Sequence, residues 1–491
     1  MSLKLIYGDI ALGAAEDAET SVTDAETFSN PAALPIGTNT GAVATLEMNC
    51  WGLSHDYKLK DKQPFALWTE SISNEMGEFD IPPRIELDFT EQYTATGITF
   101  KFSPATNEYC REIQIEWYQN GVLKDSGTYY PNAGEYAVEN TVEAFDRIVI
   151  TLLKTKLPNR RAKIEHIIIG IIREFTGKEL TAGSFIHEIN LVSAELPYNV
   201  MDASFHSRES VDFIFQKKQP VEAYDNDRMI GTYYIETGEQ TGARDYNISC
   251  QDALGVLDLD TYSGGLWLED TPFPVIVSDI VNGAFVVDIS ADLTNVKLRG
   301  YIPECTRREA LQYALFAALA CADTAGTAKI KIFTAPTGAG KEIPANETYM
   351  GGSITTGDTV TAVELTGYEI KSGEPGEDDE TIEFDGVEYA CTPTVYRAEN
   401  PNATAGMLAN VVQYDGCYLI NADNAETRVQ SLLDYHLRRR VYNTSHVLTG
   451  QSTGERATVH LPWGGTEEAN IIKMQISISG INASNTDFLL D

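Results

Sequence analysis

Short stretches in which apolar and polar residues alternate recur along this chain, and they constrain its fold more than any other feature. One stretch carries Ile113, Ile115 and Trp117 at every second position and then reaches Asn120-Gly121. Successive side chains of a strand point to opposite faces, so alternation indicates a half-buried strand, and Asn-Gly is a preferred two-residue hairpin turn. Similar turns are expected at 225–227 and at Asp385-Gly386. The sequence therefore predicts a mainly β chain.

Two segments depart from this alternation and have helical spacing. Thr306 and Glu309 form a capping-box pattern, and Leu311, Leu315 and Leu319 follow at intervals that place them on one helix face. A second helix is expected at 425–439, with a basic end that suits the helix dipole. We interpret the first helix as packing material without a catalytic role.

The charge balance excludes one large class of function. The chain has 72 acidic and 36 basic residues, which gives a formal net charge of −36. Phosphate binding needs Lys and Arg, so we expect no sequence-specific nucleic-acid binding. The same balance is compatible with a channel through which DNA passes without sticking, and it favours solubility.

The cysteines and the N-terminus indicate where the protein is made. Seven cysteines are dispersed without a C-x-x-C pair or metal-finger spacing, which predicts reduced thiols in a reducing cytoplasm. The N-terminus lacks the apolar core and cleavage site of a signal peptide. No stretch approaches the roughly 18 apolar residues of a membrane span, so we expect no stable membrane insertion.

Alternating strands dominate residues 45–175. The stretch AKIEHIIIGII is apolar almost throughout, which predicts a central strand covered on both faces. The order LWTESIS, PPRIELDF, GITFKF, IQIEWYQNGVLKDS, VEAFDRIVITLLKT and KIEHIIIG resembles a galactose-binding-like jelly roll. Modules of this type occur as insertions in tail proteins of phages and prophages. The resemblance implies a β-sandwich and includes no ligand-binding signature.

From residue 184 onward, antiparallel strands lead into the capped helix and then return. This portion resembles the baseplate hub, or tail-tip hub, proteins of phage tails and related contractile particles. The segments that carry the resemblance are FIHEINLVSAELP, QPVEAYDNDRMIGTYYIE, DYNISCQDALGVLD, GYIPECTRREALQYALFAALACAD and KIKIF. In that family each subunit has two similar β-barrels, and three subunits form a ring of six barrels that docks on a sixfold tube. This chain departs from the pattern by placing a jelly roll before the first barrel.

The expected fold class is therefore mainly β with an α+β insert. The expected domains are an extended N-terminal arm at 1–44, the jelly roll at 45–175, a first hub-type β-barrel at 181–262, an α+β domain at 266–335, and a second barrel at 345–491 that contains the helix at 425–439. The first segment is assigned as an arm because its two DAET copies, at Asp17 and Asp24, lack the apolar seam of a coiled coil.

Catalytic, cofactor and metal motifs are not predicted. The segment 335–342 resembles a phosphate loop, but Ala335 replaces its first Gly and Glu342 replaces the Ser or Thr after Lys341. No pair among the seven histidines has the H-E-x-x-H spacing, and no G-x-S-x-G elbow is present. The acidic loop at 373–380 lacks the residue order of a calcium loop.

The resemblance implies a structural hub in the tail tip or baseplate of a virion or tail-like particle. Its implied partners are two further copies of the chain, the tail tube or distal tail protein, the tip spike, the tape-measure protein and other baseplate subunits. DNA or the tape-measure protein would pass through an acidic lumen. The alternative is a peripheral, carbohydrate-binding receptor-recognition subunit that contacts cell-wall glycan. Because aromatic rings stack on sugars, its candidate contacts are Tyr129, Tyr130 and Trp68.

Overall fold

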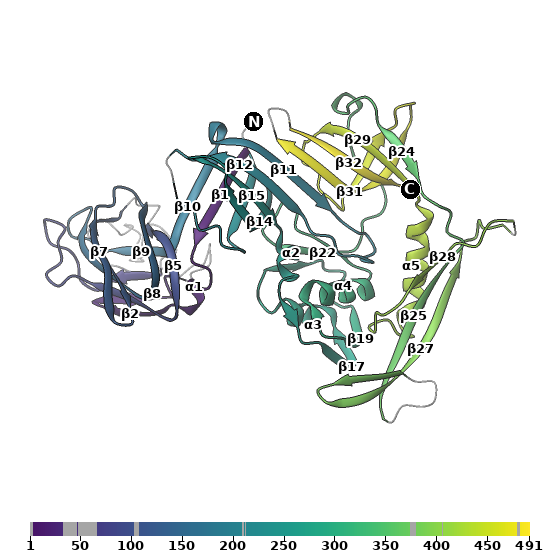
Figure 1. The fold of residues 1–491 in the computed structure, drawn as a ribbon, viewed down its shortest axis with the longest axis horizontal. Helices are drawn as coiled ribbons and strands as arrows, with labels where there is room; N and C mark the ends of the chain where they lie inside the picture. Colours follow the sequence, from purple (N-terminus) through teal and green to yellow (C-terminus); the bar gives the residue numbers. More distant parts are fainter. Residues whose placement is uncertain are drawn as a thin grey trace, which may run out of the picture. The chain divides into compact units, whose positions relative to one another are not determined.

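The chain forms two compact units that are each mainly β (Figure 1). The computed structural model describes residues 3–32, 47, 66–102, 108–208, 211, 213–373, 380–404, 406–478 and 482–491. The large unit comprises Met1–Leu5, Phe175–Val211 and Pro220–Asp491, and the small unit comprises Ile6–Glu174 and Asp212–Gln219. Strands β1 (Leu3–Ile10) and β10 (Gly170–Thr176) contain residues of both units. Cys50, His55 and residues 374–379 of the acidic loop lie outside the described residues.

The small unit is an eight-stranded sheet in the order β3-β4-β9-β5-β8-β6-β7, with β2 paired to β5. Its strands are β2 (Glu19–Thr23), β3 (Ala25–Thr27), β4 (Leu67–Thr69), β5 (Arg84–Phe102), β6 (Cys110–Gln119), β7 (Val122–Tyr129), β8 (Glu135–Thr155) and β9 (Lys163–Ile168). The apolar stretch AKIEHIIIGII, predicted as one central strand, is divided between β9 and β10. Strand β9 lies between β4 and β5 and buries Ile164 and Ile167, as expected for a central strand, whereas β10 pairs with β1 at the end of the 13-stranded sheet.

Alternation along β6 builds the core of the small unit. Ile113, Ile115 and Trp117 are fully buried, and the Trp117 ring meets the Phe145 ring edge-on at 4.8 Å between centroids. The hairpin prediction is also confirmed, because Gln119 pairs with Val122 across a turn in which Asn120 has φ 49°. Asn tolerates this left-handed conformation better than most residues, which explains its place in the turn.

The predicted N-terminal arm is wrong for the described part of residues 1–44. This part forms β1, the short helix α1 (Ala14–Asp17), β2 and β3. Strand β2 pairs with β5 from Glu19↔Asp88 to Thr23↔Arg84. The Asp17 carboxylate also accepts hydrogen bonds from the backbone N–H groups of Thr90 and Glu91, at 2.9 and 3.1 Å. The acidic composition of this segment led to the arm prediction, but the backbone of β2 and the Asp17 carboxylate of α1 both form hydrogen bonds with β5.

A single strand path runs through the large unit in the order β13-β14-β15-β12-β11-β31-β32-β29-β24, and β30 pairs with β31 and β23. The first curved sheet contains β11 (Leu180–Glu188), β12 (Val200–His206), β13 (Pro220–Asp225), β14 (Arg228–Gln240) and β15 (Asp245–Gln251). The second curved sheet contains β23 (Lys341–Glu342), β24 (Ser353–Thr356), β29 (Arg440–Val447), β30 (Arg456–His460), β31 (Thr466–Ile478) and β32 (Asn482–Leu490).

The two curved sheets are joined edge to edge through β11 and β31, which run side by side in Figure 1. Their antiparallel pairing extends from Ser184↔Ser477 to Glu188↔Lys473, and we call it the β11–β31 seam. The Lys473 ammonium lies 2.7 Å from the Glu188 carboxylate at one end of the seam. Backbone hydrogen bonds thus make one continuous sheet from two chain segments that are far apart in sequence.

The segment between the curved sheets is the predicted α+β insert. Its elements are α2 (Ala253–Leu257), β16 (Thr261–Tyr262), β17 (Gly265–Pro272), α3 (Phe273–Val281), β18 (Val287–Ile289), β19 (Lys297–Ile302), β20 (Cys305–Thr306), α4 (Arg307–Ala318), β21 (Cys321–Asp323) and β22 (Ile330–Phe333). The capping box is confirmed: the Glu309 N–H donates to Thr306 Oγ1 at 3.2 Å, and the Thr306 N–H donates to the Glu309 carboxylate at 3.0 Å. Leu311 and Leu315 are fully buried.

A four-stranded sheet and one helix complete the large unit. The sheet has the order β26-β27-β25-β28 and contains β25 (Ala362–Ser372), β26 (Glu380–Phe384), β27 (Val387–Glu399) and β28 (Val411–Tyr414). Helix α5 (Ala425–Leu437) confirms the predicted helix, and its Leu432 and Leu433 join the same apolar core as Val363 and Leu365 of the sheet. The mainly β fold class with an α+β insert is therefore confirmed.

The burial of Trp117 predicts the effect of truncating it. Trp117→Ala should lower the unfolding free energy of the small unit by about 3–5 kcal/mol, because a large side chain is lost from a fully packed site. Urea unfolding followed by circular dichroism measures this change. The matched variant Val122→Ala, on the same hairpin but 68% exposed, should change it by less than about 0.5 kcal/mol. Equal effects of the two variants would contradict the core assignment.

Candidate functional site

Metal-binding constellations are absent from the described part of the chain. Its His, Cys, Asp and Glu side chains form no group of three or more that could hold a metal ion. The six described cysteines are free, and burial raises the pKa of Cys110, Cys321 and Cys417 to about 12. Among the described helices, none is long and apolar enough to cross a membrane.

The phosphate-loop-like segment is occupied by the protein's own side chains. The Gly340 N–H donates to the Glu468 carboxylate at 2.7 Å, and the Arg456 Nε donates to the Gly338 carbonyl at 2.8 Å. The segment leads into the short strand β23, which pairs in parallel with β30. A phosphate loop instead leads into a helix whose N-terminal N–H groups face the phosphate. The geometry agrees with a structural turn.

The three candidate glycan contacts have different environments. Trp68 on β4 is 7% exposed; its indole N–H donates to Glu26 at 3.3 Å, and the Arg161 guanidinium lies 5.3 Å from its ring centroid. Tyr129 at the end of β7 is half-buried against the core, and burial raises the pKa of its hydroxyl. Tyr130 is 63% exposed. Four strands separate β4 from β7 in the strand order, so Trp68 and Tyr129 do not lie on neighbouring strands.

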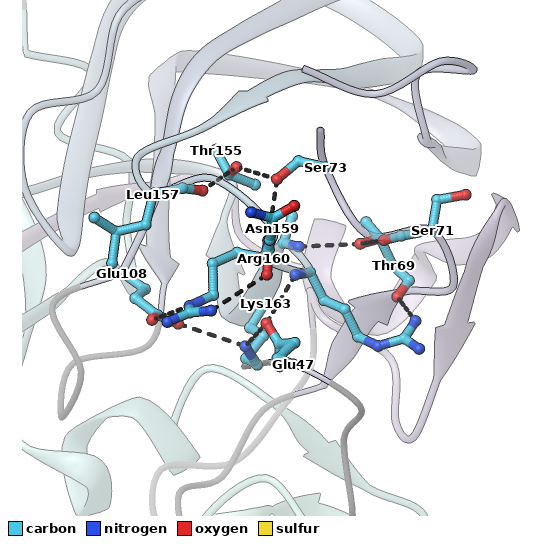
Figure 2. Close-up of polar contacts among 12 residues, drawn as sticks. Glu47, Thr69, Ser71, Ser73, Glu108, Thr155, Leu157, Asn159, Arg160 and Lys163 are labelled. Carbon is cyan, nitrogen blue, oxygen red and sulfur yellow. Dashed lines mark hydrogen bonds and ion pairs between the residues drawn. The ribbon is translucent and has the colours of Figure 1, made fainter. Parts of the chain in front are cut away.

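A cluster of ion pairs in the small unit was not predicted. The Lys163 ammonium lies 2.7 Å from the Glu47 carboxylate and 3.5 Å from that of Glu108, and Arg160 Nε lies 2.9 Å from Glu108 (Figure 2). Arg161 donates its backbone N–H to Glu47 at 2.8 Å. The sequence signal was available, since KTKLPNRRAK at 154–163 has five basic residues and no acidic one in an acidic chain.

This cluster is organised to hold the chain rather than a ligand. The side chains of Glu47 and Lys163 are 0% and 8% exposed, and those of Glu108 and Arg160 are 15% and 14% exposed. Nearby, the hydroxyls of Ser73 and Thr155 lie 2.7 Å apart, and Thr155 donates to the Leu157 carbonyl at 2.7 Å (Figure 2). Removal of one partner from a buried ion pair leaves an uncompensated charge, so each member helps to fix the connection between β8 and β9.

A buried polar network joins three parts of the large unit. Asn199, which precedes β12, donates its side-chain N–H to Asp323 at 3.0 Å and its backbone N–H to Asp252 at 2.9 Å. Thr324 donates its hydroxyl to Asp252 at 2.6 Å, and Thr453 donates to Asp323 at 2.7 Å. These five residues, which we call the Asp252–Asp323 network, are all buried. They connect the first curved sheet, the α+β insert and the segment before β30.

Burial shifts the titration of two groups in this region. Burial raises the pKa of Asp252 to about 6, although hydrogen bonds from Thr324, Asn199 and Gly255 act in the opposite direction. Burial lowers the pKa of His187 to about 4, and the negative charge of Asp323 partly opposes that shift. His187 Nε2 lies 2.6 Å from the Tyr233 hydroxyl. At neutral pH His187 is therefore an uncharged residue of the core.

One open hollow lies on the first curved sheet and reaches onto β31. Its volume is about 540 Å³, and every residue that lines it belongs to the large unit. The lining residues are mostly small or hydroxyl-bearing: Ala182, Gly183, Ser184, Asp202, Ala203, Ser204, Thr237, Glu239, Asn247, Ile248, Ser249 and Ser477. Sequence reasoning missed the hollow because these side chains come together only through the pairing of five strands.

The buried state of His187 predicts an acid-dependent loss of stability. Its folded pKa of about 4 lies below its ordinary value of 6.5, so the unfolded chain binds the proton first as the pH falls. The contribution of His187 is complete above that ordinary value and is lost as the pH falls toward about 4. Asp252 has the opposite sign, because its raised pKa gives stability that is lost as the pH rises through about 6.

Replacing His187 by Gln isolates the histidine contribution. Relative to the variant, the wild-type large unit should lose roughly 2 kcal/mol of unfolding free energy between pH 7 and pH 5. Denaturant unfolding at several pH values measures the difference. His206→Gln is the control, because its imidazole is exposed beside Asp245. Parallel pH profiles for wild type and His187→Gln would contradict the assignment.

Comparison with known proteins yields matches among solved structures only. No protein-family profile and no curated protein matches the chain. The tail protein from Neisseria meningitidis is 12% identical, with a TM-score of 0.45 over 65% of this chain and 94% of that chain. The 43 kDa tail protein of prophage MuSo2 from Shewanella oneidensis is 12% identical, with a TM-score of 0.46 over 64% and 95%. A prophage tail protein from Listeria monocytogenes is 10% identical, with a TM-score of 0.42 over 64% and 91%.

Proposed function

We propose that this chain is a structural hub of a phage tail or phage-tail-like particle. Three copies would form a ring that caps the tail tube and connects it to the tip spike and the surrounding baseplate. The observation that carries the proposal is the β11–β31 seam, which joins the two curved sheets of a single chain into one continuous sheet. A ring of three chains would then contain six curved sheets, which matches the symmetry of a sixfold tube.

The remaining features support assembly rather than catalysis as the mechanism. The insert packs its helices into one apolar core with α5 and β25, so it serves as a rigid spacer. The formal charge of −36 favours passage of DNA or of the tape-measure protein through a lumen without adhesion. The small unit would contact neighbouring baseplate proteins. We place the protein in the tail tip of the assembled particle, after synthesis in the bacterial cytoplasm.

Ring formation predicts the effect of altering an exposed apolar residue beside the end of the strand path. Met350 is 98% exposed and lies just before β24, the last strand in the order. Met350→Asp should leave the unfolding free energy within about 0.5 kcal/mol of wild type but lower the yield of assembled particles at least about tenfold, through loss of an apolar subunit contact. Counting of complete tails by negative-stain electron microscopy at equal expression of the chain measures the yield.

The conservative variant Met350→Leu should give the wild-type yield of particles. Light scattering of the purified chain, alone and with the tube protein, should give the mass of three subunits.

A particle image with this chain away from the tail axis would refute the hub. Particles that assemble normally without the chain but fail to adsorb would favour the alternative, a peripheral receptor-recognition subunit.

The observation that favours the alternative is the exposed ring of Tyr130 next to half-buried Tyr129. If this pair contacts cell-wall glycan, Tyr130→Ala should weaken retention on immobilised cell-wall polysaccharide about fivefold, since one aromatic contact contributes about 1 kcal/mol. Tyr349→Ala in the large unit, whose ring is also exposed, is the control. Equal retention of both variants and wild type would remove Tyr130 from the proposal.

A further inference from the structure

The hollow on the first curved sheet has a regular construction. Its floor crosses β14, β15, β12, β11 and β31, which are hydrogen-bonded neighbours. One row of facing residues follows the pairings Ser477↔Ser184, Ser184↔Asp202, Asp202↔Ser249 and Ser249↔Thr237. A second row follows Ala182↔Ser204, Ser204↔Asn247 and Asn247↔Glu239. Each row thus places small polar side chains across four or five strands.

The shape of the hollow has a local cause. The small side chains of Ala182, Ser184 and Ser204 leave a depression in the surface of the sheet. Two of the strands that line it have register shifts: β11 between Leu180 and Ala182, and β14 between Ile235 and Thr237. Bulges increase strand twist and re-aim side chains, so they turn a flat face into a concave one. A volume of about 540 Å³ is within the range of ligand pockets.

The charged residues that line the hollow are all acidic. Asp202 on the middle strand β12 and Glu239 on the outermost lining strand β14 are exposed carboxylates, and neither forms an ion pair with another residue of the described chain. The lining contains hydroxyls, the Asn247 amide and the two carboxylates, but no Lys, Arg or His. Phosphate groups would be repelled there. The lining also lacks an aromatic ring on which a sugar could stack.

We propose that this hollow binds an extended, lysine- or arginine-bearing polypeptide segment of a partner protein. The cationic side chains would lie against Asp202 and Glu239, and the serine hydroxyls together with Asn247 would bond the segment's polar groups. Small lining residues let a partner chain approach the sheet face closely. The inference goes beyond the hub proposal, because it concerns one face of a single copy and requires no ring.

A direct binding measurement tests this proposal on the full-length protein. The probe is a fluorescein-labelled ten-residue peptide of alternating Lys and Ser, and the readout is fluorescence anisotropy in 50 mM salt. Saturable binding is expected, with about fivefold weakening in the double variant Asp202→Asn and Glu239→Gln, because two exposed ion contacts contribute about 1 kcal/mol in sum. An alternating Glu and Ser peptide should not bind.

Two further variants separate this site from general attraction to an acidic protein. Glu383→Gln with Glu388→Gln removes the same charge from facing, exposed residues of β26 and β27, and should change the affinity by less than twofold. Ser204→Trp fills the hollow without a charge change and should abolish saturable binding, with circular dichroism to verify the fold. Equal weakening by both charge variants, unaltered binding by Ser204→Trp, or no saturable binding to wild type would each overturn the proposal.

Discussion

The large unit depends on keeping two buried carboxylates, Asp252 and Asp323, fully hydrogen-bonded. Their donors come from three separate stretches of chain: Asn199, Thr324 and Thr453. Leaving a buried polar group without a hydrogen-bond partner costs more free energy than the hydrogen bond contributes when it is made. Loss of any one of these donors would therefore destabilise the network. The network therefore fixes the positions of the first curved sheet, the insert and the start of β30 with respect to one another.

The same physical logic operates on a smaller scale in the small unit. Lys163 at the start of β9 lies between Glu47 and Glu108 and holds the chain segments that carry these carboxylates. In both places, buried charged groups bond to partners from other segments and hold those segments together. This use of charge explains why groups that look chemically active in a sequence contribute to architecture here.

Local patterns in the sequence predicted the local structure well. The Asn120-Gly121 turn, the Thr306 capping box and the helix that begins at Ala425 all depend on residues a few positions apart, and all are present. The strand β2 was missed, because its pairing with β5 depends on a partner distant in sequence. The hollow lined by Ser184, Asp202 and Ser477 was missed for the same reason, since sequence alternation gives the face of a residue but not its neighbours across strands.

The β11–β31 seam also determines when the fold can be completed during synthesis. Strand β11 leaves the ribosome well before its partner β31, because Glu188 and Lys473 are 285 positions apart. Until β31 arrives, the edge of β11 has unpaired backbone groups that another chain could bind. Contacts between distant segments form slowly, and large chains expose such edges while they fold. Pairing of β11 with β31 within one copy therefore competes with pairing between copies until β31 has been synthesised.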